Sequence, residues 1–162
     1  MLDTRHHPVL DFLRDRLAGR RQHPGRDAAH MRYPTAISEL LGFEIVDVGP
    51  GTASVAVEVR AARHGNQQGT VHGGFLVELA DAAIGTAHST LMLPGESFTS
   101  IDIRATFLRP VWDDTLTAHA RPVHSGRTIT HYSCEVVRRD GKAVATVTST
   151  VMTLRGQRAA GR

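Results

Sequence analysis

The sequence has few of the residues on which several protein classes depend. It has a single cysteine, Cys134, among 162 residues, so an intrachain disulfide and a cysteine-rich metal site are both excluded. Its most apolar stretch, residues 75–93, contains Glu78, Asp81 and His88, and a membrane-spanning helix tolerates few such groups. The first residues include acids and lack the apolar run of a secretory signal. We therefore expect a cytoplasmic protein that does not associate with a membrane.

Positive charge is concentrated near the N-terminus. Residues 1–32 hold seven Arg and four Asp, which already accounts for the net charge of +3 of the whole chain. Residues 33–162 carry twelve basic and twelve acidic side chains, so this larger part is electrically balanced. Nucleic-acid-binding domains usually carry a basic stripe interleaved with aromatic residues, and aromatic residues make up only 5% of this sequence. We predict no nucleic-acid partner.

Hydrophobic periodicity predicts three parts: an N-terminal extension (residues 1–32) with a short helix over 8–17, a globular domain (33–154) and a polar tail (155–162). Within the domain, the patterns predict one short helix, a β-hairpin, one long helix and four further strands, over residues 36–41, 43–48 with 53–60, 73–93, and 100–108, 115–123, 127–138 and 142–154. Because most strands follow the long helix instead of alternating with helices, we expect an α+β fold with an antiparallel sheet.

The segment richest in chemical signals is residues 66–81, in which a polar loop leads into His72-Gly73-Gly74 and then a hydrophobic helix. Free backbone N–H groups and the positive end of the helix dipole gather at such a helix start, and glycine leaves them accessible. The Gly73 N–H is therefore a candidate donor to the negative oxygen of a reacting thioester carbonyl. A tight loop-to-helix turn without a catalytic role would have the same sequence.

Asp81 strengthens the functional interpretation. It lies among apolar residues of the predicted helix, where burying an unpaired carboxylate costs free energy, so a partner in the core or a catalytic role must explain it. Seven residues separate it from Gly74, almost two helical turns, which predicts the same helical face. Glu78 is expected to point elsewhere.

Helix geometry makes a further demand on these residues. Eight residues at the helical rise put Gly73 and Asp81 about 12 Å apart, whereas attack on one carbonyl needs both groups within a few ångströms of it. If they form one site, Asp81 of one chain must meet Gly73 of a second. A twofold homodimer is then a requirement of the chemistry.

Taken together, the ordered motifs resemble the hotdog-fold acyl-CoA thioesterases of the phenylacetic-acid-degradation type. The resemblance covers residues 36–154 and rests on Asn66, Gly69-Thr70-Val71-His72-Gly73-Gly74, Asp81, Ser100-Ile101-Asp102 and Phe107-Leu108-Arg109-Pro110. It implies a long helix wrapped by an antiparallel sheet, a homodimer that joins two sheets, and often a homotetramer made from two dimers.

The same resemblance implies roles for five residues. Asp81 would activate water as a general base or attack the thioester itself as a nucleophile, and the sequence does not choose between these roles. Gly73 would supply the oxyanion N–H, His72 would support that loop, Asn66 would orient substrate or nucleophile, and Ser100 would help to hold the water.

One position departs from the family pattern. Gln67 stands where proline often follows the asparagine, so the loop is expected to be less rigid.

The sequence therefore predicts a thioesterase that hydrolyses acyl-CoA with no metal or other cofactor. Its ten histidines show no ligand spacing, and the Gly-x-Ser-x-Gly elbow of serine hydrolases is absent. The main alternative is a hotdog module that binds acyl-CoA without cleaving it and whose basic N-terminal arm contacts a partner or DNA. A hydratase on the same fold lacks the additional Asp/His pair that proton transfer to carbon would need.

Overall fold

The structure, a computed structural model, describes residues 6–20 and 31–160. Most of the polar linker predicted after residue 17, and the end of the C-terminal tail, lie outside these residues, and the domain boundary predicted at residue 32 stays a prediction. The elements are, in chain order, α1 (Pro8–Leu17), α2 (Ala36–Leu41), β1 (Glu44–Gly49), β2 (Thr52–Val59), α3 (Ala61–His64), α4 (Gly73–Ser89), β3 (Ser97–Phe107), β4 (Asp114–Ser125), β5 (Ile129–Arg138), β6 (Ala143–Leu154) and a 3₁₀ turn, η1 (Gly156–Arg158).

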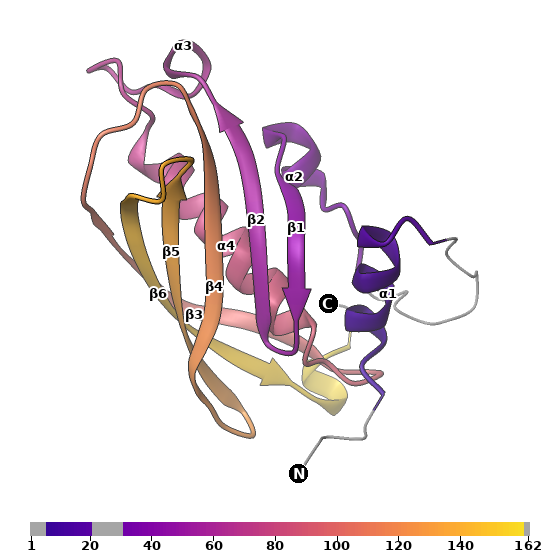
Figure 1. The fold of residues 1–162 in the computed structure, drawn as a ribbon. Helices are drawn as coiled ribbons and strands as arrows, with labels where there is room; N and C mark the ends of the chain where they lie inside the picture. The colour runs from indigo at the N-terminus through magenta and orange to yellow at the C-terminus, as the bar shows by residue number, and fades with distance from the viewer. Residues whose placement is uncertain (1–5, 21–30, 161–162) are drawn as a thin grey trace.

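The six strands form one antiparallel sheet in the order β1-β2-β4-β5-β6-β3, and α4 lies along one face of it (Figure 1). The predicted α+β fold is confirmed. The alternation expected in β2 is also confirmed, because Val55, Val57 and Val59 are buried in the core that α4 covers. Strands β1 and β3 are the two edges, so each has one side without a strand partner among residues 6–20 and 31–160.

Helix α4 begins at the predicted residue but ends at Ser89, four residues before the predicted end. The reason is Thr90, whose hydroxyl donates to the Ala87 carbonyl at 2.7 Å and accepts from the Gly51 N–H at 2.8 Å. The bond from the Gly51 N–H distinguishes Thr90 from Thr86, which also donates to a carbonyl of α4 but lies inside the helix. Thr90 thereby ties the end of α4 to the β1–β2 turn.

Helix α1 belongs to the same hydrophobic core as the sheet. Its Val9, Leu10 and Leu13 are buried, and Figure 1 shows the helix beside β1 at the edge of the sheet. The chain after it is anchored by Tyr33, whose hydroxyl is hydrogen-bonded to the Ser89 hydroxyl at 2.7 Å. Part of the N-terminal extension therefore packs against the domain and is not a free arm.

A buried histidine joins the end of α4 to two strands. His88 is 1% exposed, and its ring nitrogens are hydrogen-bonded to the Tyr132 hydroxyl at 3.1 Å and the Thr153 hydroxyl at 3.0 Å. Burial lowers the pKa of His88 from 6.5 to about 4. The neutral imidazole is therefore part of the packed core.

This histidine should make the folded state sensitive to acid. Between pH 6.5 and about 4 the unfolded chain binds a proton at His88 that the folded chain does not, so stability should decline by up to about 3 kcal/mol as the pH falls through that range. Urea unfolding across this range should give a shallower decline for His88→Gln than for the wild type. The same change at the exposed His119 should leave the decline intact, and equal slopes for His88→Gln and wild type would contradict the assignment.

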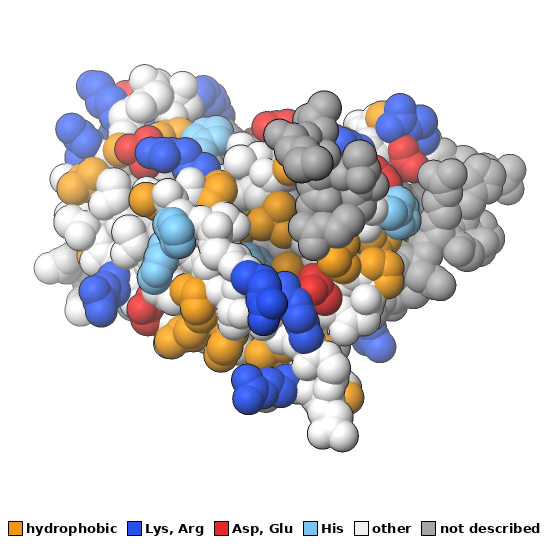
Figure 2. Space-filling model, turned by 90° about the horizontal axis from the view of Figure 1, so that it is seen from below, with side chains coloured by type: hydrophobic (Ala, Val, Ile, Leu, Met, Phe, Trp, Pro, Cys, Tyr) orange, Lys and Arg blue, Asp and Glu red, His pale blue; other side chains and the backbone are white. Residues whose placement is uncertain are grey.

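No helix in the described part of the chain is both long and apolar enough to cross a membrane. Figure 2 shows the molecule of Figure 1 from below. On that face the Lys and Arg side chains are scattered and do not form one continuous basic patch.

Candidate active site

The first turn of α4 leaves one backbone donor available. His72 is the N-cap, and its Nδ1 accepts the Gly74 N–H at 2.9 Å, while its carbonyl accepts the Phe75 N–H at 3.0 Å. Among the described residues, the Gly73 N–H has no hydrogen-bond acceptor. It therefore lies at the positive end of a 17-residue helix, free to bind an anionic oxygen.

The loop before α4 is held by its own hydrogen bonds. Asn66 Oδ1 accepts the Gln68 N–H at 2.9 Å and the Thr70 N–H at 3.2 Å, and the Asn66 amide donates to the Thr70 hydroxyl at 3.0 Å. The His72 N–H donates to the His64 carbonyl at 2.8 Å, which anchors the loop to α3, a short helix that the sequence patterns missed. These bonds restrain the loop although Gln67 replaces the family's proline.

Asp81 lies two turns into α4 and is half-buried. Burial raises the pKa of its carboxyl above the usual value of 3.8. Glu78, three residues earlier and also half-buried, has a pKa raised first by burial and then by the negative charge of Asp81. The expectation that Glu78 points away is corrected here, because residues three apart are neighbours on a helix surface and the two carboxyls interact.

Ser100 is exposed on the edge strand β3, just before a bulge that separates it from Asp102. The Asp102 carboxylate fixes this bulge by accepting the Thr150 N–H at 2.9 Å and the Thr150 hydroxyl at 3.1 Å. Within the described residues, the Ser100 hydroxyl makes no hydrogen bond. A bulge bends the strand and commonly re-aims a side chain next to it.

The structure therefore gathers some of the predicted site residues and separates others. Asn66, His72 and Gly73 lie together at the start of α4. Asp81 is eight residues further along the same helix, about 12 Å from Gly73 by the helical rise. A single chain does not bring Asp81 and the Gly73 N–H to one carbonyl.

Sequence analysis missed the contact between Gly73 and Phe107. The Phe107 ring packs so closely on Gly73 that a Cβ there would lie 2.8 Å from Cζ and 3.1 Å from Cε1. Phe107 ends β3 and remains 55% exposed. It belongs to one of the family motifs, but its distance from Gly73 in the sequence hides the contact.

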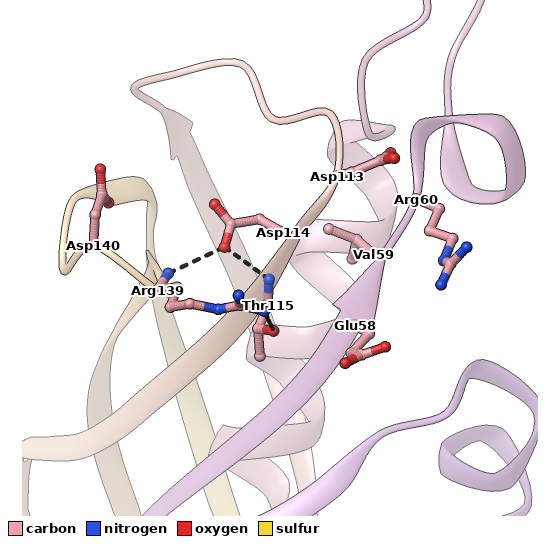
Figure 3. A pocket seen from close by; sticks show the side chains of 8 residues that line it. All are labelled: Glu58, Val59, Arg60, Asp113, Asp114, Thr115, Arg139 and Asp140. Carbon is pink, nitrogen blue, oxygen red and sulfur yellow. Dashed lines mark hydrogen bonds between the residues drawn. The ribbon is translucent and has the colours of Figure 1, made fainter.

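A surface depression lies where β2 ends and β4 begins, and none of the predicted site residues lines it (Figure 3). This open depression of about 720 Å³ is polar, and several of its charged groups are hydrogen-bonded to the protein itself. Asp114 accepts the Thr115 N–H at 2.7 Å, Arg139 donates to the Thr115 hydroxyl at 2.7 Å, and Asp113 accepts the Ala61 N–H at 2.8 Å. In the described part of the chain, no group of three or more His, Cys, Asp or Glu side chains is placed to hold a metal ion.

The chain is similar to known proteins in both sequence and structure. The family model described as thioesterase superfamily matches residues 68–145. A putative esterase of Deinococcus radiodurans is 34% identical over 127 residues, covering 76% of this chain and 84% of that protein. A 1,4-dihydroxy-2-naphthoyl-CoA hydrolase of Listeria monocytogenes is 37% identical over 93 residues, covering 56% of this chain and 73% of that protein. Among solved structures, the PaaI protein of the E. coli phenylacetic acid degradation operon superposes with a TM-score of 0.72 and 31% identity, over 81% of this chain and 93% of that one.

Proposed function

The chain belongs to the thioesterase superfamily, and from this premise we propose that it hydrolyses acyl-CoA thioesters at a site shared by two subunits. It is a thioester hydrolase with the hotdog fold. The reaction combines R–CO–S–CoA with water to give the free acid and CoA. The proposed steps use the substrate, water and the chain's own groups, without a cofactor.

The observation that carries the proposal is the unpaired Gly73 N–H at the start of α4. The thioester carbonyl oxygen would accept this N–H, and the bond would strengthen as negative charge develops on that oxygen. His72 supports the geometry by capping the helix, and a Cβ at Gly74 would stand only 3.0 Å from the His72 Nδ1. Asn66 would keep the loop in place and orient the substrate or nucleophile.

Asp81 would act on the carbonyl carbon from the partner chain. As a general base it takes a proton from water, the water oxygen bonds to the carbonyl carbon, and the tetrahedral intermediate expels the CoA thiolate. As a nucleophile its carboxylate bonds to the carbonyl carbon and the CoA thiolate leaves, and water then cleaves the mixed anhydride to release the acid and regenerate the carboxylate. Both routes require the ionised carboxylate, so activity should rise with pH through the raised pKa of Asp81. Ser100 would hold the attacking water.

A dimer through β3 would bring the two halves together. Strand β3 is an edge of the sheet, and its side chains Ile101, Ile103 and Phe107 are exposed although apolar. An unpaired, apolar edge strand is a ready surface for a second copy of the chain. We propose a twofold dimer in which each Asp81 faces the partner's Gly73, and a tetramer made of two such dimers.

The proposed location is the cytoplasm. The single thiol, Cys134, is buried and unpaired, and burial raises its pKa to about 12. A buried thiol of this kind is unreactive, and a chain without disulfides suits the reducing cytoplasm.

The activity is tested by following thiol release from a panel of linear, branched and aryl acyl-CoAs with the wild-type protein. The buried Cys134 should add little background to a thiol reagent. We expect turnover of at least one class, and hydrolysis without added metal. Tight binding of acyl-CoA with no thiol released from any member of the panel would contradict the proposal and favour the non-catalytic binding module.

A further inference from the structure

Phe107 occupies a position at which an exposed aromatic ring has a direct effect on the proposed chemistry. Its ring lies against the Cα of Gly73, at the place where a side chain of residue 73 would begin. Cα–Cβ bonds of a helix tilt toward its N-terminus, so the ring stands beside the opening where the Gly73 N–H points out. A thioester whose oxygen accepts this N–H must therefore place its other atoms next to the ring.

The surroundings distinguish the acyl side of the thioester from its CoA side. From Phe107 back along β3, Ala105 and Ile103 lie on the same face of the strand, because side chains alternate. Their partners on β6, among them Ala145 and Val147, are buried, so this is the face turned toward α4. The row is apolar and suits an acyl chain.

The loop that leads into Gly73 is polar. The loop over residues 66–70 carries Asn66, Gln67, Gln68 and Thr70 and fits the amide-rich pantetheine arm. With the CoA arm along this loop, the ring of Phe107 meets the carbon attached to the carbonyl.

We infer that Phe107 is a specificity-determining residue, which restricts the substrate to acyl groups that are unbranched at the carbon next to the carbonyl. The inference rests on the proposed function of Gly73. A methyl branch at that carbon would have to displace the ring, whereas a CH₂ group passes beside it. Discrimination of one methyl group by an apolar wall amounts to about 10- to 200-fold in kcat/KM.

The test compares the linear acyl-CoA that the wild type hydrolyses best with its 2-methyl-branched isomer of equal carbon number. We expect the wild type to prefer the linear isomer at least about tenfold, and Phe107→Ala to bring the ratio of the two kcat/KM values close to one. Phe107→Leu, which keeps more of the packing, should give an intermediate ratio. Trp112→Ala is the matched control, because Trp112 is also 55% exposed but none of its atoms is among the three nearest to a Cβ at Gly73. Its ratio should stay that of the wild type.

Three results would overturn the inference. One is a wild type that takes both isomers equally well. The second is an unchanged ratio in Phe107→Leu and Phe107→Ala while both rates fall together, since a merely structural role does that. The third is the same change of ratio in Trp112→Ala. Failure of the proposed function looks different, because the wild type would then release no thiol from any acyl-CoA.

Discussion

Asp81→Asn is expected to lower kcat for acyl-CoA hydrolysis by about 100-fold to 10,000-fold, the range that a positioned general base contributes. The amide of Asn has the shape of the carboxylate but can neither take a proton from water nor attack the thioester. Because burial disfavours the charged carboxylate, the neutral amide should not destabilise the fold. The rate of thiol release at saturating substrate is the measurement.

Glu78→Gln provides the matched control for Asp81. It removes a half-buried carboxyl from the same helix, three residues away. We expect it to keep most of the activity and to leave the acid limb of the pH profile in place, because burial is what raises the pKa of Asp81. An Asp81→Asn variant as active as the wild type would show that Asp81 has no part in the mechanism. An inactive Glu78→Gln variant together with an active Asp81→Asn variant would assign the catalytic role to Glu78 instead.

Gly73→Pro is expected to lower kcat by about 100- to 1,000-fold, the cost of one lost oxyanion donor. Proline has no N–H, and it suits the first position of a helix. The residue before a proline must be extended, and His72 already has φ −63° and ψ 134°. This substitution therefore removes the donor with little demand on the backbone.

The control must separate the loss of the N–H from crowding at Phe107. Gly73→Ala places a Cβ against the same ring but keeps the N–H, so the difference in kcat between the alanine and proline variants isolates the donor. We expect the alanine variant to be partly active and to improve when Phe107→Ala is added. Equal activity of the proline and alanine variants would show that the Gly73 N–H is not an oxyanion donor.

Local patterns predicted the elements whose residues carry their own signal. The alternating valines of β2 and the start of α4 at Gly73 follow from periodicity and from the glycines after His72. The end of α4 could not be predicted in this way, because Thr90, just after the helix, is hydrogen-bonded to the N–H of Gly51, 39 residues earlier. The short helix α3 carries too few residues to show a period.

Long-range packing accounts for what the sequence could not predict about the site. The motif order indicated Asn66, His72, Gly73, Asp81 and Ser100, and helical rise alone predicted that one chain cannot unite Gly73 with Asp81. The contact of Phe107 with Gly73 arises because β3 passes beside the start of α4, which no local spacing encodes. The interaction of Glu78 with Asp81 was available from their three-residue spacing and was misjudged.

The shared site is tested most directly by mixing two inactive variants, one with Asp81→Asn and one with Gly73→Pro. Co-expression with different tags and native mass spectrometry would establish that the subunits assemble together. If each site takes Asp81 from one chain and Gly73 from the other, random assembly leaves about one quarter of the sites with both groups intact, and the mixture should regain about that share of wild-type activity. Mixed assemblies that stay as inactive as the two parents would place both groups within a single chain and contradict the account.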